Sequence, residues 1–283
     1  MNTQRVGSAD RPVETVATFW AHYDDDLIFA NPTVQHSLDR GQRTRSFFFT
    51  AGDAGTGMSK YVDGREAGIR AAYDNMRGRS GTWSDRSVVL RNGVTVTVTR
   101  PEGDDRVSLT FLRLPDGGLG GDGYAATGRQ SLRQLVTGEL PSLRTLDTEQ
   151  VITLELLRST VAELVVAFDA TTVLSHHPGS ANGPGSDHPD HQSVGTVMAT
   201  AVDAGLIDAD VVHYALGYAA AARPVNISPD ILARKLDVFA SYASHDPVIA
   251  RDEVHEYLEI RGFGAWLQRQ YLVPHCELVR TDN

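Results

Sequence analysis

A short apolar run close to the N-terminus ends abruptly in a histidine and three nearby acids. The run covers residues 16–21 and is apolar except for Thr18. It leads directly into His22, Tyr23, Asp24, Asp25 and Asp26. Such a run is typical of a strand buried on both faces, as at the centre of a parallel sheet. Open α/β sheets bind ligands at the carboxyl ends of their strands, so we expect a functional site immediately after this strand.

The three adjacent carboxylates have a plainer interpretation as well. They repel one another unless a cation or solvent offsets the repulsion, and an acidic loop capping the next helix would place them in solvent. Taken alone, three aspartates favour that acidic loop. His22 and a second polar cluster far along the chain reverse the preference.

The second cluster is His188-Pro189-Asp190-His191, which follows a predicted strand over Thr171–Ser175. Pro189 marks the start of a helix, with Asp187 as its expected cap. In a helical first turn the two histidines lie on the same side, three residues apart. Two histidines and one carboxylate form a common catalytic zinc set. His176 and His177 also follow the strand and could line the pocket, but histidines beside a proline are more often solvated, which is the interpretation favoured here.

The remaining pattern alternates strands with helices, which predicts a mostly parallel sheet covered on both faces. We expect further strands at Gln42–Thr50, Arg106–Leu114 and Val211–Ala215, and a hairpin at Ser87–Thr99 that turns at Asn92-Gly93. Helices are expected at Gly64–Arg77, Thr148–Ala167, about 188–204 and Pro229–Ala243. The predicted fold class is therefore α/β, with a Rossmann-like sheet, in a single domain over residues 1–283. Its core motifs span residues 15–205, and residues 206–283 complete it.

Composition limits the range of partners. The formal net charge of −10 argues against nucleic acid or an anionic membrane. The one cysteine, Cys276, excludes an intramolecular disulfide and suits a reducing compartment. Neither a signal peptide nor an apolar stretch of the roughly 20 residues needed to cross a membrane is evident. We therefore expect a cytoplasmic protein that acts on a small molecule.

Both polar clusters resemble signatures of a known family. Ala21-His22-Tyr23-Asp24-Asp25-Asp26 resembles the Ala/Pro-His-Pro-Asp-Asp-Glu signature of the LmbE-like (PIG-L) family of zinc-dependent N-deacetylases, and His188–His191 is similar to its His-Pro-Asp-His signature. The helix carrying Arg65 and the loop Leu114-Pro115-Asp116-Gly117 also resemble family features. The resemblance covers roughly residues 15–205.

The resemblance implies a role for individual residues. It makes His22, Asp25 and His191 the ligands of one Zn²⁺ ion. It makes Asp24 the general base, and His188 the group that supports the oxyanion and protonates the leaving amine. Arg65 and Asp116 would bind substrate. Three departures accompany it: Tyr23 replaces proline and is expected to loosen the backbone, Asp26 replaces glutamate, and Gly68 stands where the family often has glutamate.

The expected activity is hydrolysis of an N-acyl amide, most simply an acetamide, on an amino sugar or a glycoside or natural-product conjugate of one. Amide hydrolysis needs an activated water, a polarised carbonyl and a proton for the leaving nitrogen, and zinc supplies the first two. A catalytically inactive carbohydrate- or metal-binding protein of the same fold is the alternative. A magnesium site for phosphoryl transfer is disfavoured, because magnesium prefers oxygen ligands to His22 and His191.

Overall fold

An eight-stranded sheet forms the centre of the computed structural model, which describes residues 13–179 and 187–278. Its strand order is β10-β9-β8-β1-β2-β5-β4-β3. The five adjacent strands β9, β8, β1, β2 and β5 run parallel to one another. The other pairs are antiparallel: β10 with β9, β4 with β5, and β3 with β4. The strands are β1 (Thr15–Trp20), β2 (Arg43–Thr50), β3 (Trp83–Val89), β4 (Thr95–Pro101), β5 (Val107–Leu114), β8 (Thr172–His176), β9 (Val212–Ala215) and β10 (Leu272–Pro274).

Strand β1 lies between β2 and β8, in the interior of the sheet, as the apolar run predicts. Its side chains alternate between two separate cores. Val16 and Trp20 pack into one, and Ala17 and Phe19 into the other. Burial on both faces explains why the strand is apolar throughout rather than alternating with polar residues.

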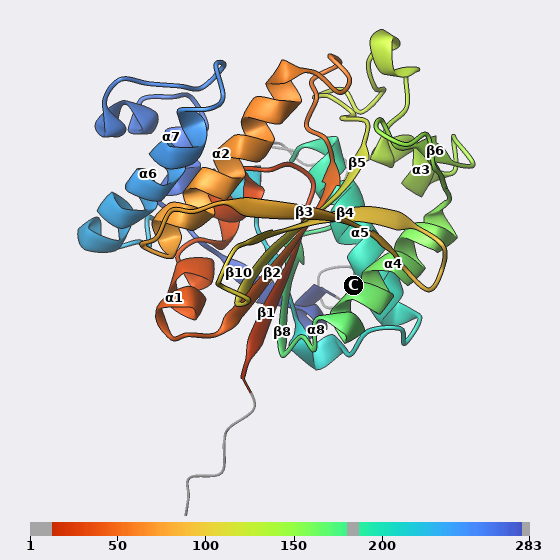
Figure 1. The fold of residues 1–283 in the computed structure, drawn as a ribbon, viewed down its shortest axis with the longest axis horizontal. Coiled ribbons are helices and arrows are strands. Elements are labelled where there is room, and N and C mark those ends of the chain that lie inside the picture. Colours follow the sequence, from red (N-terminus) through yellow and green to blue (C-terminus); the bar gives the residue numbers. More distant parts are fainter. Residues whose placement is uncertain (1–12, 180–186, 279–283) are drawn as a thin grey trace, which may run out of the picture.

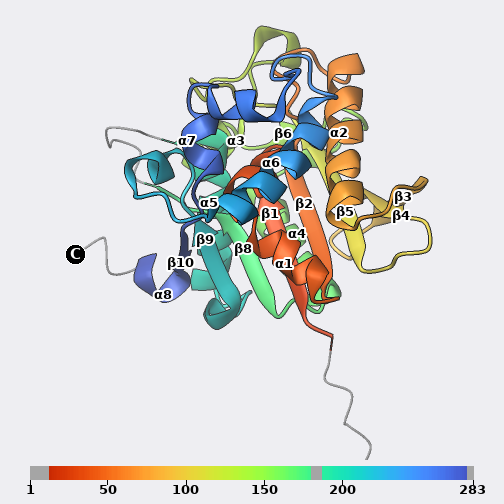
Figure 2. The ribbon, with the colours of Figure 1, turned by 90° about the vertical axis from the view of Figure 1, so that its left-hand side faces the viewer.

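Helices cover both faces of the sheet (Figures 1 and 2). One layer contains α1 (Thr33–Asp39), α2 (Lys60–Met76), α6 (Pro229–Ala243) and α7 (Phe263–Leu267). The other contains α3 (Leu132–Thr137), α4 (Leu154–Ala167) and α5 (Pro189–Asp203). The shorter elements are η1 (Asp26–Ala30), η2 (Ala125–Thr127), β6 (Leu143–Arg144), β7 (Val151–Ile152), η3 (Ala209–Val211), η4 (Tyr218–Ala222), η5 (Val254–Leu258) and α8 (His275–Leu278). The predicted α/β fold with a mostly parallel sheet is confirmed.

Three predicted helix boundaries were wrong. Helix α4 does not begin near Thr148, because β7 pairs with β6 in this region and Glu149 has a positive φ of 55°. The helix is capped by Thr153, whose hydroxyl accepts a hydrogen bond from the Leu156 amide at 3.1 Å. Helix α2 begins at Lys60, a turn before Gly64. Helix α5 is capped by His188 rather than by Asp187, because the His188 ring accepts the Asp190 amide.

Within the described residues, none of the helices has the length and apolar character required to span a bilayer. The hairpin turning at Asn92-Gly93 is confirmed as β3 and β4, with Gly93 at a φ of +87°. Organisation of residues 1–283 as a single domain stays a prediction.

Candidate active site

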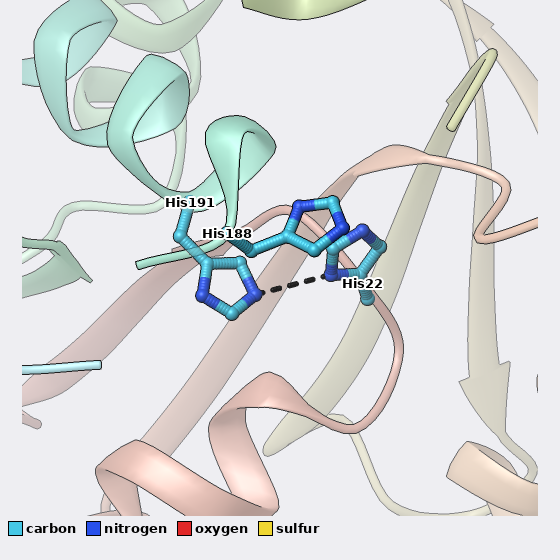
Figure 3. Close-up of side chains that lie close together, drawn as sticks. All are labelled: His22, His188 and His191. Carbon is cyan, nitrogen blue, oxygen red and sulfur yellow. Dashed lines mark hydrogen bonds between the residues drawn. The ribbon is translucent and has the colours of Figure 1, made fainter. Parts of the chain in front are cut away.

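The polar residues of the two signatures meet at the carboxyl edge of the parallel strands. His22 follows β1, His176 ends β8 and Asp116 follows β5, while His188 and His191 lie at the start of α5. Figure 3 shows the rings of His22, His188 and His191 converging from these separate elements. The ring centroid of His22 lies 4.7 Å from that of His188 and 5.2 Å from that of His191. The fold thus brings together the two clusters, as the strand ends predicted.

His22, Asp25 and His191 direct their donor atoms at one another. His22 Nδ1 lies 3.2 Å from His191 Nε2, and His191 Nε2 lies 3.1 Å from Asp25 Oδ1. His22 Nδ1 is 3.5 Å from the other oxygen of Asp25. Two ligands bonded to a tetrahedral zinc at 2.0–2.2 Å are about 3.3–3.6 Å apart, since the angle between them is close to tetrahedral. The separations of His191 Nε2 from His22 Nδ1 and from Asp25 Oδ1 are close to this spacing, while His22 Nδ1 approaches the other oxygen of Asp25. Among the described residues, donor atoms within 4.8 Å of one another include those of His22, His188 and His191, and those of Asp25, His176 and His191.

Acidic neighbours orient His191 and occupy one oxygen of Asp25 with other partners. Asp187 Oδ1 lies 2.8 Å from His191 Nδ1, which leaves His191 Nε2 to face His22 and Asp25. Asp25 Oδ2 accepts the His22 amide at 2.6 Å and lies 2.9 Å from His176 Nε2, so Oδ1 remains for a metal. Metal-binding histidines usually have such a second hydrogen-bonding partner.

His176 is the residue that sequence reasoning placed wrongly. It was expected to be solvated, but its side chain is fully buried beneath the site. The available signal was its position: it is the last residue of β8, and β8 pairs directly with β1. Asp187 was expected to cap α5 and instead binds His191.

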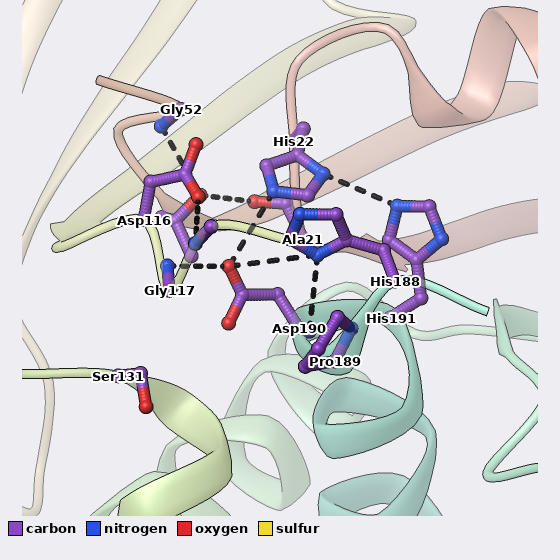
Figure 4. A network of polar contacts seen from close by, with 12 residues as sticks. Ala21, His22, Gly52, Asp116, Gly117, Ser131, His188, Pro189, Asp190 and His191 are labelled. Atoms are coloured by element: carbon purple, nitrogen blue, oxygen red, sulfur yellow. Dashed lines mark hydrogen bonds and ion pairs between the residues drawn. The ribbon is translucent and has the colours of Figure 1, made fainter. Parts of the chain in front are cut away.

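Asp190 approaches His22 at Nε2, the ring nitrogen that does not face His191 (Figure 4). Its Oδ2 accepts the Gly117 amide at 2.8 Å and is 3.5 Å from His22 Nε2. A neutral imidazole carries one N–H, so a metal at His22 Nδ1 places that N–H on Nε2, toward Asp190. Figure 4 also draws Asp116 beside this group; His22, Asp116, His188 and Asp190 have donor atoms within 4.8 Å of one another.

His188 is held as the neutral form. Its Nδ1 accepts the Asp190 amide at 3.2 Å, which leaves the ring hydrogen on Nε2. Burial lowers the pKa of His188, and the positive charges of His22 and His191 lower it further. The neutral ring can therefore donate one hydrogen bond from Nε2.

Asp24 forms a buried ion pair with Arg65. Arg65 Nη2 lies 2.8 Å from Asp24 Oδ1, and burial raises the pKa of Asp24 while the guanidinium opposes that rise. Arg65 also donates to the Tyr242 hydroxyl at 2.6 Å and to the Gly52 carbonyl at 2.7 Å, and it lies 3.3 Å from Asp246. The residue that the resemblance assigns to substrate binding thus faces the expected base, and the C-terminal third of the chain fixes it there.

Asp116 lies in the loop after β5, where hydrogen bonds fix both its backbone and its side chain. The Asp116 amide donates to Asp53 at 2.9 Å, and Asp116 Oδ1 accepts the Gly118 amide at 2.7 Å. Gly117 leaves no room for a side chain, because a Cβ there would lie 2.6 Å from Asp190 Oδ1. Close backbone approach therefore positions Asp116 next to the α5 terminus.

Two family departures concern packing rather than the pocket. Asp26 is fully buried, its carboxylate accepts the Tyr73 hydroxyl at 2.6 Å, and burial raises the pKa of Asp26 to about 7. Gly68 lies where α2 crosses α6: a Cβ there would be 2.7 Å from the Tyr242 carbonyl. A glutamate at position 68 would separate these helices.

A cavity lined by the described residues lies away from the two polar clusters. It measures about 800 Å³ and lies between the β3–β4 hairpin and α4. The described residues that line it include Arg86, Val98 and Phe168, but none from the two signatures. We place the site by its chemistry rather than by cavity size, because the convergent donors lie at the strand ends.

Solved structures that are similar to this chain include three of low sequence identity, of which the first supports a shared fold. A deacetylase of N,N'-diacetylchitobiose from Pyrococcus horikoshii is 13% identical, with 94% of this chain and 86% of that chain covered and a TM-score of 0.52. A triple mutant of a deacetylase from the teicoplanin biosynthetic pathway is 13% identical, with 89% and 88% covered and a TM-score of 0.48. A conserved protein from Thermus thermophilus is 14% identical, with 92% of each chain covered and a TM-score of 0.45.

At these identities the likeness concerns the fold alone. No curated protein matches the sequence. The family model described as GlcNAc-PI de-N-acetylase, however, matches residues 17–202, which include both polar clusters and the strands that carry them. The chain therefore belongs to the PIG-L family of N-deacetylases.

Proposed function

We propose that the protein is a metal-dependent hydrolase that removes an N-acetyl group from an amino sugar or a conjugate of one. In this proposal His22, Asp25 and His191 hold one Zn²⁺ ion. The observation that carries it is the position of His191 Nε2, which lies 3.2 Å from His22 Nδ1 and 3.1 Å from Asp25 Oδ1, near the buried carboxylate of Asp24. Such a set offers ligands for one metal and a separate base within one turn of the chain.

A zinc ion bound there would act as a Lewis acid and would lower the pKa of a bound water toward about 7. Asp24 takes the proton of the attacking water, and Arg65 orients the carboxylate through their 2.8 Å contact. His188 donates its Nε2 hydrogen to the oxygen of the acyl group as charge develops on it. Because His188 is neutral, protonated Asp24 is the better placed group to return a proton to the leaving nitrogen.

The proposed substrate class is an N-acetylated amino sugar or a conjugate of one. The family model is described as GlcNAc-PI de-N-acetylase, and one structure of similar fold is an N,N'-diacetylchitobiose deacetylase. Asp116 reaches the site from the loop after β5 and can accept hydrogen bonds from sugar hydroxyls. Asp116 is therefore the proposed substrate-binding residue, while Arg65 contributes through Asp24.

The test is a free-amine release assay over a panel of N-acetylated sugars and sugar conjugates. The zinc-loaded protein should release amine, chelator should abolish release, and added zinc should restore it. His191→Ala should stay inactive after zinc is added, which controls for metal acting in solution. If the zinc-loaded protein binds one of these sugars tightly and releases no amine, the protein is a binder and the enzymatic proposal is wrong.

A further inference from the structure

The turn that contains Asp24 has an unusual residue, Tyr23, at the first of its two central positions. The His22 carbonyl accepts the Asp25 amide at 3.4 Å, so Tyr23 and Asp24 are the two middle residues of a turn. Proline is favoured at the first of these, because its ring presets the required φ. The family signature has proline there, and this chain has a tyrosine whose side chain is fully buried. The turn must therefore be restrained in some other way.

The ring of Tyr23 is fixed between two aromatic side chains. Its centroid lies 5.4 Å from that of Phe48 on β2 and 5.2 Å from that of Phe111 on β5. Both pairs are edge-to-face, at 80° and 81°, which is a favourable arrangement for aromatic rings. The Tyr23 hydroxyl extends past these rings and donates to Glu66 Oε1 at 3.2 Å.

Glu66 is itself immobilised. Arg113 binds both of its oxygens, through Nε at 2.7 Å and Nη2 at 3.1 Å. Arg70 donates to the same carboxylate at 3.3 Å. Bidentate arginine–carboxylate pairs are geometrically specific, so the acceptor for the Tyr23 hydroxyl has a fixed position.

Two neighbouring contacts join this turn to α2. Tyr23 binds Glu66, and the next residue, Asp24, binds Arg65. Consecutive residues of the turn thus contact consecutive residues of the helix. One contact alone would permit the turn to pivot, whereas two fix both its position and its rotation.

We infer that Tyr23 is a positioning residue, whose anchored side chain replaces the restraint that proline gives the family signature. It holds the turn so that His22 and Asp25 face His191 and Asp24 faces Arg65. On this inference the tyrosine restrains the backbone, in place of the loosening expected when proline is absent. The inference rests on the proposed function, because it concerns the alignment of the proposed ligands and base.

The test measures zinc dissociation constants by competition with a chromophoric chelator, and kcat and KM on any cleaved substrate. Tyr23→Phe removes only the hydroxyl. We expect zinc affinity or kcat to fall about tenfold, with KM changed less than about twofold, as for residues that support metal ligands. Tyr214→Phe is the matched control: it also removes a buried tyrosine hydroxyl, which bonds His275 at 2.9 Å, and should leave zinc affinity unchanged.

A second pair of variants separates positioning from simple core packing. Tyr23→Ala and Tyr23→Pro both remove the ring and should lower the melting temperature by similar amounts. Only proline restrains the turn, so Tyr23→Pro should bind zinc more tightly than Tyr23→Ala. Equal zinc affinity in these two would overturn the inference, as would wild-type zinc affinity and kcat in Tyr23→Phe. If Tyr23→Pro does not fold, Tyr23→Phe and Tyr214→Phe decide the matter.

Zinc titration needs no substrate, which keeps the two proposals distinguishable. If the wild-type protein binds zinc but cleaves no amide, the proposed function is contradicted, and the zinc affinity of Tyr23→Phe still decides whether Tyr23 positions the turn. A wild-type protein that binds no zinc overturns both proposals.

Discussion

The imidazole rings of His176 and His191 stack face to face, with centroids 4.0 Å apart and planes inclined by 6°. Both rings contact Asp25, through opposite oxygens: His176 Nε2 is 2.9 Å from Oδ2 and His191 Nε2 is 3.1 Å from Oδ1. Burial and the charge of His191 lower the pKa of His176 to about 4. His176 is therefore a neutral support for the carboxylate rather than a second charge beside the metal site.

Loss of His176 should weaken metal binding without removing a proposed ligand. His176→Phe keeps a ring against His191 but cannot bond Asp25, so zinc affinity should fall roughly 10- to 100-fold. His176→Gln retains a donor and should recover part of the loss. Zinc competition titrations compare the three proteins. Wild-type affinity in His176→Phe would show that the contact with Asp25 has no influence on the metal.

Asp24→Asn should retain zinc and substrate but lower kcat roughly 10²- to 10⁴-fold, the usual range for general acid–base catalysis. Asparagine is nearly isosteric and its oxygen can still accept from Arg65, but it cannot take a proton. Asp26→Asn is a close control, since Asp26 faces Tyr73 rather than the proposed ligands. The Asp26→Asn variant should keep kcat within about threefold of the wild-type value. Steady-state kinetics with a parallel zinc titration provide the measurement, and a base other than Asp24 is required if Asp24→Asn turns over normally.

Zinc binding should release protons and strengthen as the pH rises. Burial alone would lower the pKa of His191, but Asp25 and Asp187 raise it to about 9 in the metal-free protein. Burial alone would also lower the pKa of His22, but Asp25 and Asp190 raise it well above its usual value. A metal must therefore displace protons from both rings at neutral pH, and zinc affinity should increase by more than about tenfold per pH unit between roughly pH 6.5 and 8.5.

Calorimetry in buffers of different ionisation enthalpy measures the number of protons released. Asp187→Asn should reduce the release at neutral pH, because one of the two carboxylates that keep His191 protonated is gone. Affinity independent of pH, together with no proton release, would contradict a protonated His191 in the free protein.

Lys235 should make stability depend on pH. Its side chain is buried, donates to the Ile28 carbonyl at 2.6 Å, and has a pKa lowered by burial to about 7. Between pH 7 and the ordinary lysine pKa, about 10.4, the unfolded chain binds more protons than the folded one, so this group favours folding more as the pH rises. The melting temperature of wild type minus that of Lys235→Met should therefore increase from pH 6.5 to 9.5. A difference that stays constant over this range would mean that the pKa of Lys235 is the same in both states.

Local patterns in the sequence were sufficient for the fold and for much of the site. The apolar run of β1, the hairpin turn and the helix starting at Pro189 each follow from the residues they contain. Where a nonlocal contact competed, the pattern misled: pairing of β7 with β6 moved the start of α4 from the predicted Thr148. The placement of each proposed ligand role on one residue came from the family resemblance and stays a prediction.

The sequence by itself determined which residue types stand at the ends of the central strands, and hence that two histidine–aspartate clusters meet at one edge of the sheet. Only the tertiary structure decided their partners. His176 contacts Asp25 across 151 residues of sequence, Asp187 orients His191, Arg65 turns toward Asp24, and Tyr23 is anchored on Glu66. The periodicity of apolar residues predicts whether a side chain is buried, because burial depends on which face of its helix or strand the residue occupies. Which buried polar group meets which depends on side-chain reach between elements distant in the chain, and no local pattern records that distance.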